Sequence, residues 1–281
     1  HKPAGTEAVP PHTFDVLKYT LNLDLYHCYN APYPRSFTGS NIIKFKVDSA
    51  LNKIKLNADT TLIIDSVRLA GVSFTHPNDT LTIQLNRTYN VGEVANVKIY
   101  YRHKNVQDYA FYSNNGTVFT DAEPEGARKW YPCWDHPSDK ALLDLTAKVK
   151  ANVKLGSNGR LADSTLVADT LTYHWVSDQN VATYLIVMTS KINYQLNINY
   201  WHKLSNPADS IPLRYYFNLG ENPASIMAIL PDMTTWFSQN FIEHPFDKNG
   251  FATLNSDFAW GGMENQTLTS LCPGCWSESL V

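Results

Sequence analysis

Two stretches of the chain carry residue types that could bind a charged ligand. The first reads FTDAEPEGARKWYPCWDHPSDKA, and in it Asp121, Glu123 and Glu125 alternate. Residues spaced by two share one side of an extended segment, so these carboxylates could form a wall that attracts a cation, although Pro124 interrupts the regularity. The alternative is an acidic surface loop before a packed corner of Trp and Pro residues, and the pattern alone favours this alternative.

The second stretch reads WGGMENQTLTSLCPGCWSESLV. Gly261 and Gly262 would let the backbone approach a ligand closely and leave N–H groups free to bind it. Glu264 could accept hydrogen bonds from an ammonium group. A glycine pair beside polar residues is more often an ordinary turn, so this stretch in isolation is a weak indication of a site.

Two of the four cysteines lie close together, in Cys272-Pro-Gly-Cys275. They could form a short-loop disulfide, half of a metal site or a redox pair. A tetrahedral zinc site needs two further ligands, and Cys28 and Cys133 lie far away in the sequence. A redox motif would normally precede a helix in a βαβ unit, which the pattern does not show. We therefore predict a structural disulfide if the protein is exported and two buried thiols otherwise.

The nine histidines form neither H-E-x-x-H nor H-x-H, and no G-x-S-x-G or phosphate-binding glycine loop occurs. His136 and His244 are predicted to be turn or surface residues. The chain as given therefore holds no complete catalytic centre.

The elements that would position these residues are mostly strands. From Val16 onward apolar residues recur at period two, as in TLNLDLY, and short Asn, Asp, Gly and Pro turns separate the runs. This pattern predicts an antiparallel sandwich or bent saddle over residues 1–205. After the polar stretch HKLSNPADS we expect one more strand and then a helix that Asn222 caps. An interior proline, Pro231, predicts a kink or a break into two segments near residue 230.

Composition narrows the class of protein. The chain has 281 residues, enough for two domains, with 43% hydrophobic and 17% charged residues, as in a soluble globular protein. A net charge of −3 without a Lys/Arg cluster argues against nucleic acid as a partner. No apolar run approaches the roughly 20 residues that span a bilayer, so we expect no membrane span. The oligomeric state stays open.

Taken together and in this order, the two stretches resemble the signatures of the aminopeptidase N family of zinc metallopeptidases, family M-one. GARKWYPCWDHPSDKA, residues 126–141, is similar to the Ala-Arg-x-x-x-Pro-Cys-x-Asp-x-Pro signature of the family's N-terminal domain. GGMEN, residues 261–265, is similar to its exopeptidase motif, usually Gly-Ala-Met-Glu-Asn. The resemblance implies a saddle-like antiparallel β-sandwich N-terminal domain over residues 1–205. Residues 206–281 would begin a thermolysin-like α+β catalytic domain.

The resemblance also implies a substrate-binding set. Glu264 and Glu123 would bind the free α-amine of a peptide, Gly261 and Gly262 would lie along its first residue, and Met263 would line the first side-chain pocket. The remaining members of the set are Asn265 and Asp121. Asp121 stands where many relatives have Gln, which suggests a preference for basic first residues. Relatives usually lack the Cys-Pro-Gly-Cys sequence that follows here.

In this family the zinc motif H-E-x-x-H follows the exopeptidase motif, and the chain stops at about the point where it should begin. We therefore expect zinc in the full-length protein, and no metal site and no turnover in this chain. The implied function is a zinc-dependent aminopeptidase that cleaves single residues from peptides with a free N-terminus. A non-catalytic relative that serves as a peptide- or protein-binding scaffold is the alternative. A carbohydrate-binding sandwich is weaker, and a row of exposed tryptophans would favour it. A composition rich in Thr, Asn and Tyr, with a start that looks processed, leads us to expect export to the periplasm or beyond the cell.

Overall fold

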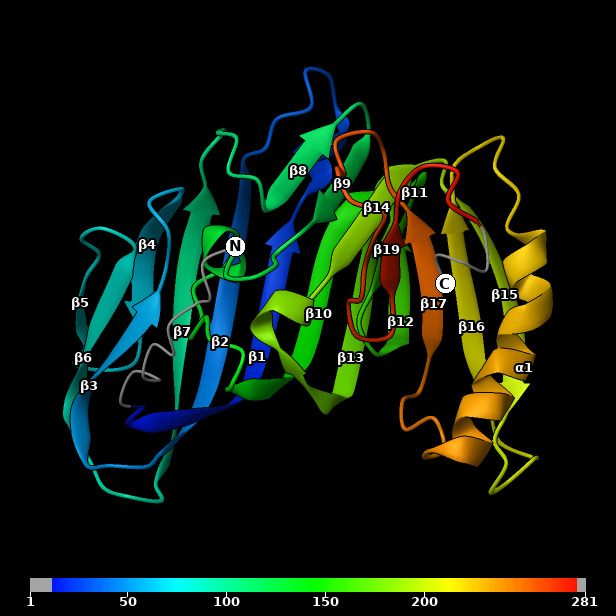
Figure 1. Ribbon diagram of the computed structural model, residues 1–281. Helices are drawn as coiled ribbons and strands as arrows, with labels where there is room; N and C mark the ends of the chain where they lie inside the picture. Colours follow the sequence, from blue (N-terminus) through cyan, green and yellow to red (C-terminus); the bar gives the residue numbers. More distant parts are fainter. Residues whose placement is uncertain (1–11, 277–281) are drawn as a thin grey trace, which may run out of the picture.

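The structure, a computed structural model, describes residues 12–276. It is mainly β, with four sheets and one α-helix among these residues (Figure 1). The largest sheet has seven strands, in the order β12 (Arg160–Val167), β13 (Thr170–Ala182), β10 (Lys140–Lys150), β1 (Phe14–Asp24), β2 (Phe37–Val47), β7 (Val94–His103) and β4 (Leu62–Arg68). Neighbours are antiparallel except β1 and β10, which are parallel. A parallel pair needs a long connection, and the chain passes through β2 to β9 between these two strands.

Two smaller sheets complete the sandwich. One contains β3 (Leu51–Asn57), β6 (Thr80–Tyr89) and β5 (Ser73–Thr75), and the other contains β11 (Val153–Ser157), β14 (Met188–Ile192), β9 (Thr117–Thr120) and β8 (Phe111–Asn114). Three short 3-10 helices lie in the connections: η1 (Tyr26–Tyr29), η2 (Ala127–Lys129) and η3 (Thr183–Leu185). The predicted mainly β, sandwich-type fold is confirmed.

The sandwich is held by one continuous core that the period-two pattern supplies. In β1, Leu21 and Leu23 are buried while Asn22 and Asp24 are exposed, as the alternation predicts. The buried side chains of β1 belong to the same cluster as Ile83 of β6 and side chains of β9 and β11. Because all three sheets contribute to one core, the loops at their ends are fixed relative to one another.

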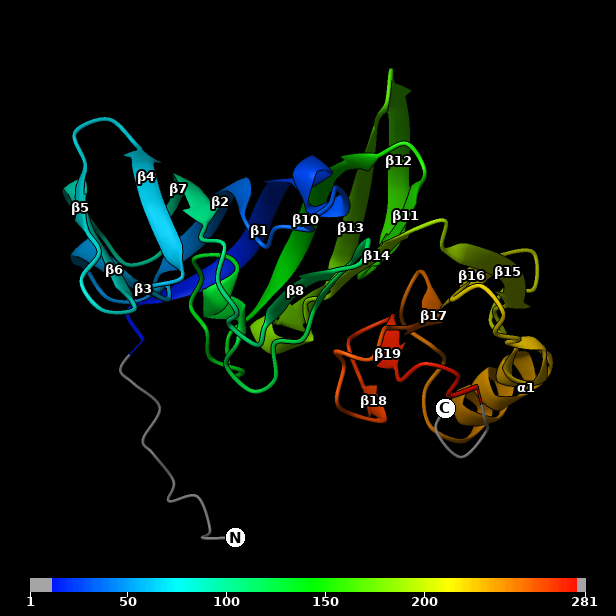
Figure 2. The same cartoon turned by 90° about the horizontal axis from the view of Figure 1, so that it is seen from above.

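A fourth sheet follows the sandwich. Its order is β15 (Gln195–His202), β16 (Ser210–Phe217), β17 (Asn249–Thr253), β19 (Thr269–Leu271) and β18 (Gly262–Met263), and α1 (Ala224–Asn240) connects β16 to β17. This sheet and α1 lie beyond the β12–β13 edge, at the end opposite β3 to β6 (Figures 1 and 2). The boundary predicted at residue 205 falls in the turn between β15 and β16. The division into domains stays a prediction.

Of the two outcomes predicted for Pro231, a break into two segments does not occur, because a single helix α1 contains the proline. Proline has no N–H, so the carbonyl of Met227, four residues earlier, loses its donor within the helix. The side chain of Asn199 on β15 replaces that donor, with Nδ2 at 2.9 Å from the Met227 oxygen. At the start of the helix the Asn222 side chain accepts a hydrogen bond from the N–H of Ala224, at 3.1 Å.

The two ends of α1 differ in burial. Ile226 and Leu230 are buried against the fourth sheet, whereas Trp236, Phe237 and Phe241 are 55%, 52% and 75% exposed.

Among residues 12–276, no helix combines the length and the apolar character needed to cross a membrane.

Candidate functional site

A pocket of about 370 Å³ is lined by residues of both stretches, and we call it the acid pocket. Its lining residues are Asp121, Glu123, Trp260, Gly261, Gly262, Met263 and Glu264. A smaller hollow of about 240 Å³ is lined by Glu123 and Glu264 again, with Pro124, Pro137 and Tyr184. The fold therefore brings Glu123 and Glu264, which are far apart in the chain, to a common cavity.

Two acidic or amide residues of the same stretches do not line the acid pocket. Glu125 turns away and pairs with Arg128, at 3.1 Å, so the wall of three alternating carboxylates, which the spacing allowed but did not favour, does not form. The physical reason is that the chain turns here instead of running extended, and the N–H of Gly126 donates to the carbonyl of Ala122 at 2.7 Å. Asn265 is also directed inward: it is 3% exposed, and its Nδ2 donates to the Ser270 hydroxyl at 3.1 Å.

The turn that carries Glu123 is fixed to the sandwich by the residues that follow it. The Arg128 Nε donates to the buried carboxylate of Asp135 at 3.0 Å, and the Arg128 backbone N–H donates to the same oxygen at 3.1 Å. The other Asp135 oxygen accepts from the Thr183 hydroxyl at 2.8 Å. At Gly126 a side chain would be crowded, because an added Cβ would lie 3.0 Å from the Ala122 Cα and the backbone there would have to shift. These residues position Glu123 and do not themselves line the pocket.

The second acid, Glu264, directly follows the short strand β18. This strand pairs antiparallel with β19, which pairs parallel with β17. The Met263 side chain is 6% exposed and packs in one cluster with Phe119 of β9, the strand that ends immediately before Asp121. This cluster, which also contains Leu254 and Phe258, joins the two walls of the acid pocket. Met263 thus packs into the protein while it borders the pocket.

The turn after Glu264 is bound by the turn between β11 and β12. The N–H of Gly159 donates to the Thr267 hydroxyl at 2.8 Å, and the Asn158 side chain donates to the carbonyl of Gln266 at 2.7 Å. Asn158 is fully buried. On the other side, the buried Lys248 amine donates to the Thr267 carbonyl at 2.7 Å. The sandwich therefore sets where Glu264 stands relative to Glu123.

Sequence reasoning assigned no role at the site to Asn158, Gly159, Trp260 and Tyr184. Asn158 and Gly159 lie in the sequence LGSNGRL, residues 155–161, whose composition is typical of a turn, and the segment that this turn binds lies about a hundred residues later. Trp260 immediately precedes the glycine pair, and this position was the one available signal that it borders the pocket.

The acid pocket carries uncompensated negative charge. Three of its lining side chains are carboxylates and none is a lysine or arginine. Burial and the neighbouring Glu123 raise the pKa of Asp121 from an ordinary value of 3.8 to about 6, while a hydrogen bond from Trp260 opposes them. Bringing acids together in this way costs free energy unless a cation binds among them.

The arrangement suits an organic cation better than a metal ion. Within residues 12–276 no three His, Cys, Asp or Glu side chains come close enough to hold a metal. The carboxylates of the acid pocket instead surround a space that could take an ammonium group with its three donors. The residues present therefore do not fit the zinc ion that the resemblance implies for the full-length protein.

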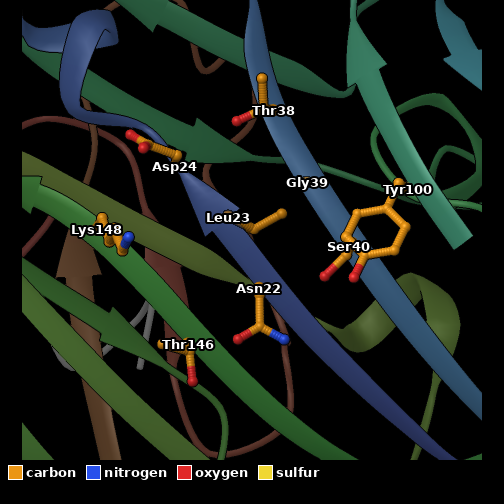
Figure 3. Close-up of a pocket in the computed structure, with 9 residues that line it drawn as sticks. All are labelled: Asn22, Leu23, Asp24, Thr38, Gly39, Ser40, Tyr100, Thr146 and Lys148. Carbon is orange, nitrogen blue, oxygen red and sulfur yellow. The ribbon is translucent and has the colours of Figure 1, made fainter. Parts of the chain in front are cut away.

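A second hollow lies on the open face of the seven-stranded sheet and is lined mostly by residues with polar side chains (Figure 3). It measures about 270 Å³ and is lined by Asn22, Leu23, Asp24, Thr38, Gly39, Ser40, Tyr100, Thr146 and Lys148. None of these is a tryptophan. The exposed tryptophans of the described chain are Trp236 and Trp260, on separate segments, so the row expected of a carbohydrate-binding sandwich is missing from residues 12–276.

Comparisons with known sequences agree with the two motifs. Aminopeptidase M1-C of Oryza sativa subsp. japonica is 24% identical over 252 residues, which cover 83% of this chain and 28% of that protein. Aminopeptidase M1 of Arabidopsis thaliana is 23% identical over 284 residues, which cover 89% and 29%. Probable aminopeptidase 1 of Sulfurisphaera tokodaii is 24% identical over 254 residues, which cover 87% and 30%. The chain thus spans less than a third of the length of these relatives.

Solved structures share the fold. An M1 zinc metallopeptidase from Deinococcus radiodurans superposes with a TM-score of 0.80 at 19% identity, over 95% of this chain and 61% of that one. A mutant of a two-domain M1 zinc metallopeptidase bound to L-arginine gives a TM-score of 0.81 at 19% identity, over 96% and 63%. Residues 16–185 match the family model described as the peptidase M1 N-terminal domain. The resemblance drawn from the two motifs is confirmed, and the chain belongs to the peptidase M1 family.

Proposed function

We propose that the protein containing this chain is a zinc-dependent aminopeptidase that removes single residues from peptide N-termini. The chain would supply the part of the site that binds the free α-amine of the substrate. The observation that carries this proposal is the acid pocket, which Glu123 and Glu264 enter from two distant parts of the chain. The names of the sequence relatives support the same activity.

The physical basis is the chemistry of a buried ammonium group. Such a group has three donors and a full charge, and it is costly to take out of water unless several acceptors converge on it. Glu123 and Glu264 are exposed at the pocket and Asp121 is the buried member. An internal peptide bond or an acetylated N-terminus has neither the charge nor the three donors. The pocket would therefore select the first residue of a peptide.

In the same proposal the exposed backbone of Gly261 and Gly262 lies along the first substrate residue, with Met263 beside its side chain. Asp121 adds a third carboxylate and would favour basic first residues. We expect the ratio of kcat/KM for Arg over Leu substrates to fall in Asp121→Asn. An unchanged ratio would remove Asp121 from the specificity role.

Zinc, in this proposal, is bound by parts of the full-length protein other than residues 12–276, which bring no three metal-ligand side chains together. When bound, zinc supplies an activated water and polarises the carbonyl of the peptide bond. Residues of this chain hold the amine and orient the first residue. Given alone with zinc, the chain is expected to show no turnover above that of its Glu264→Ala variant.

The test uses the full-length protein with zinc and fluorogenic Leu and Arg amides, each with a free and an acetylated amine. In the proposal the bound substrate covers Glu123 and Glu264 and so buries their charge pairs with its amine. Replacing one member of such a pair costs about 2–5 kcal/mol, so Glu123→Gln and Glu264→Gln should each lower kcat/KM at least about 30-fold. Glu125→Gln is the matched control, because Glu125 belongs to the same segment but pairs with Arg128 outside the acid pocket. It should keep kcat/KM within about twofold.

Two results would contradict the proposal. One is full activity in Glu123→Gln or Glu264→Gln, and the other is equal cleavage of free and acetylated substrates. Binding of peptides with a free amine but no cleavage by the full-length protein would instead favour a non-catalytic peptide-binding relative.

We also propose that the protein is exported. The disulfide between Cys272 and Cys275 supports this, since disulfides persist in oxidising compartments. Recovery of the protein with reduced cysteines, in the cytosolic fraction of its own cells, would contradict export.

A further inference from the structure

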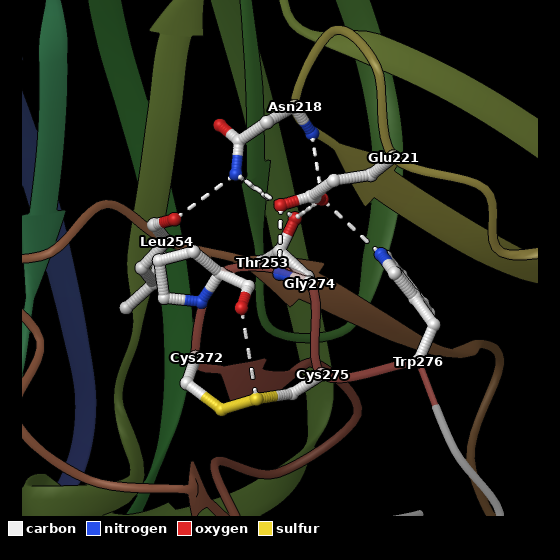
Figure 4. The surroundings of a disulfide bond; sticks show 9 residues. Asn218, Glu221, Thr253, Leu254, Cys272, Gly274, Cys275 and Trp276 are labelled. Atoms are coloured by element: carbon white, nitrogen blue, oxygen red, sulfur yellow. Dashed lines mark hydrogen bonds between the residues drawn. A yellow bond between two sulfur atoms is a disulfide. The ribbon is translucent and has the colours of Figure 1, made fainter.

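The Cys272–Cys275 disulfide closes a short loop directly after β19 (Figure 4). The backbone N–H of Cys272 donates to the carbonyl of Gly261 at 3.0 Å, and Gly261 lines the acid pocket. Beyond this hydrogen bond, β18 and β19 pair with each other as antiparallel strands. The disulfide loop is therefore bonded directly to the strand that leads into Glu264.

The opposite side of the same loop is held by one carboxylate (Figure 4). Glu221 accepts from the N–H of Gly274 at 2.8 Å and from the indole N–H of Trp276 at 3.1 Å. It also accepts from the backbone and side chain of Asn218 and from the Thr253 hydroxyl. Burial alone would raise the pKa of Glu221, but these hydrogen bonds outweigh burial and lower it. The loop thus joins β17 and the segment before α1 to the strand of the acid pocket.

The strands that depend on this loop are very short. β18 has two residues and β19 has three, so their ladder supplies few hydrogen bonds to hold its own register. The loop itself is open to solvent: Pro273 and Gly274 are exposed, and Cys272 and Cys275 are partly exposed. A short strand pair that borders a ligand pocket is therefore clamped by a bond that a reductant can reach.

We infer that the Cys272–Cys275 disulfide is a redox-sensitive clip that positions the strand of the acid pocket and so controls how tightly the substrate amine is bound. This inference rests on the proposed function for its substrate and on the hydrogen bonds of the loop for its geometry. The reductant is a dithiol. One of its thiolates attacks a sulfur of the disulfide, which forms a mixed disulfide and breaks the Cys272–Cys275 bond with release of one cysteine thiolate. The second thiolate of the dithiol then attacks the dithiol's own sulfur in the mixed disulfide and displaces the other cysteine thiolate. In sum, two electrons and two protons reach the protein as the dithiol becomes a cyclic disulfide.

The other cysteines do not compete for this reaction. Cys28 and Cys133 are fully buried free thiols. Burial raises the pKa of Cys28 to about 12 and raises that of Cys133 well above its ordinary value, so neither forms a reactive thiolate near neutral pH. Among the four cysteines of this chain, a redox effect would therefore come from Cys272 and Cys275.

The experiment compares the full-length protein before and after dithiothreitol, with alkylation and peptide mapping to show that Cys272 and Cys275 have been released as thiols. Closing a ring of four residues limits the effect on a local ordering equilibrium to about 20-fold. We expect reduction to raise KM for a free-amine substrate roughly 3- to 20-fold while kcat changes less than about twofold. Hydrogen exchange of the amides of residues 261–271 should quicken in parallel. Reoxidation should restore both values.

Cys272→Ser/Cys275→Ser is the matched variant. It should show the raised KM and the faster exchange without treatment, and dithiothreitol should change neither. The inference is overturned if reduction leaves both KM and the exchange of residues 261–271 unchanged, or if dithiothreitol still acts on the double variant. Should the full-length protein cleave no aminoacyl substrate, the proposed function fails, but the exchange measurement still decides whether the disulfide positions the strand.

Discussion

Replacing Asp121 by Asn should make the protein more stable near neutral pH while it weakens the site. Asp121 is 9% exposed, lies beside Glu123, and meets no cationic side chain in the acid pocket. Its pKa of about 6, against an ordinary 3.8, corresponds to about 3 kcal/mol of unfavourable free energy when it is ionised. The pocket is open to solvent, which screens the charges, so we expect about 1–2 kcal/mol to be measured.

The pH dependence follows from the direction of the shift. Because the folded-state pKa of Asp121 lies above the unfolded one, the folded protein binds more protons between about pH 4 and pH 6. The contribution of Asp121 to the free energy of unfolding therefore falls as the pH rises through this window, and it stays low above about pH 6. Wild type and Asp121→Asn should be about equally stable near pH 4. At about pH 7.5 the free energy of unfolding of Asp121→Asn should exceed that of wild type by the full amount, about 1–2 kcal/mol.

Calorimetric unfolding from about pH 4.5 to 8 is the assay, and 1–2 kcal/mol corresponds to roughly 2–6 °C in Tm for a domain of this size. Glu125→Gln, an exposed acid of the same turn, controls for the loss of a carboxylate. The reasoning is refuted if Asp121→Asn is less stable than wild type at about pH 7.5, or if its advantage is the same at every pH.

Three further changes test how the site and the fourth sheet are held. Gly159→Ala should lower the free energy of unfolding by about 2–5 kcal/mol and should lower kcat/KM. The reason is that φ of residue 159 is +68° and an added Cβ would lie 2.0 Å from a carbonyl oxygen of β13. A thermal unfolding midpoint within about 1 °C of wild type would contradict this. Asn199→Ala should cost about 1–2 kcal/mol in urea unfolding, because the Met227 carbonyl loses its donor, and adding Pro231→Ala should recover most of the loss. Additive losses in the double variant would exclude that explanation. Burial lowers the pKa of Lys248 well below its ordinary value, so the stability of wild type relative to Lys248→Met should rise from about pH 7 to pH 10, and a flat difference would show that Lys248 is charged in the fold.

The sequence by itself determined the class of fold and the residues to examine as a candidate site. Period-two burial in runs such as TLNLDLY is a local property, because successive side chains of a strand face opposite sides, and the structure follows it residue by residue. Two short motifs of the sequence resemble signatures of the peptidase M1 family, and this resemblance identified the family. Glu123 and Glu264 were both predicted before their relation in space was known.

Only the tertiary structure decided that these two carboxylates line one pocket, because contacts remote in sequence place them there. The turn at Asn158 and Gly159 binds the turn after Glu264, and Met263 packs with a strand next to Asp121. No local pattern encodes such pairings, since each partner alone reads as an ordinary turn or apolar residue.

The same reason explains two local features that the sequence pattern did not decide. Glu125 leaves the expected row of acids because the backbone turns to bond with itself, and α1 continues through Pro231 because a side chain on another strand satisfies the carbonyl that proline leaves free. Sequence sets what each segment can do by itself. Which hydrogen bonds it finally makes depends on the neighbours that folding supplies.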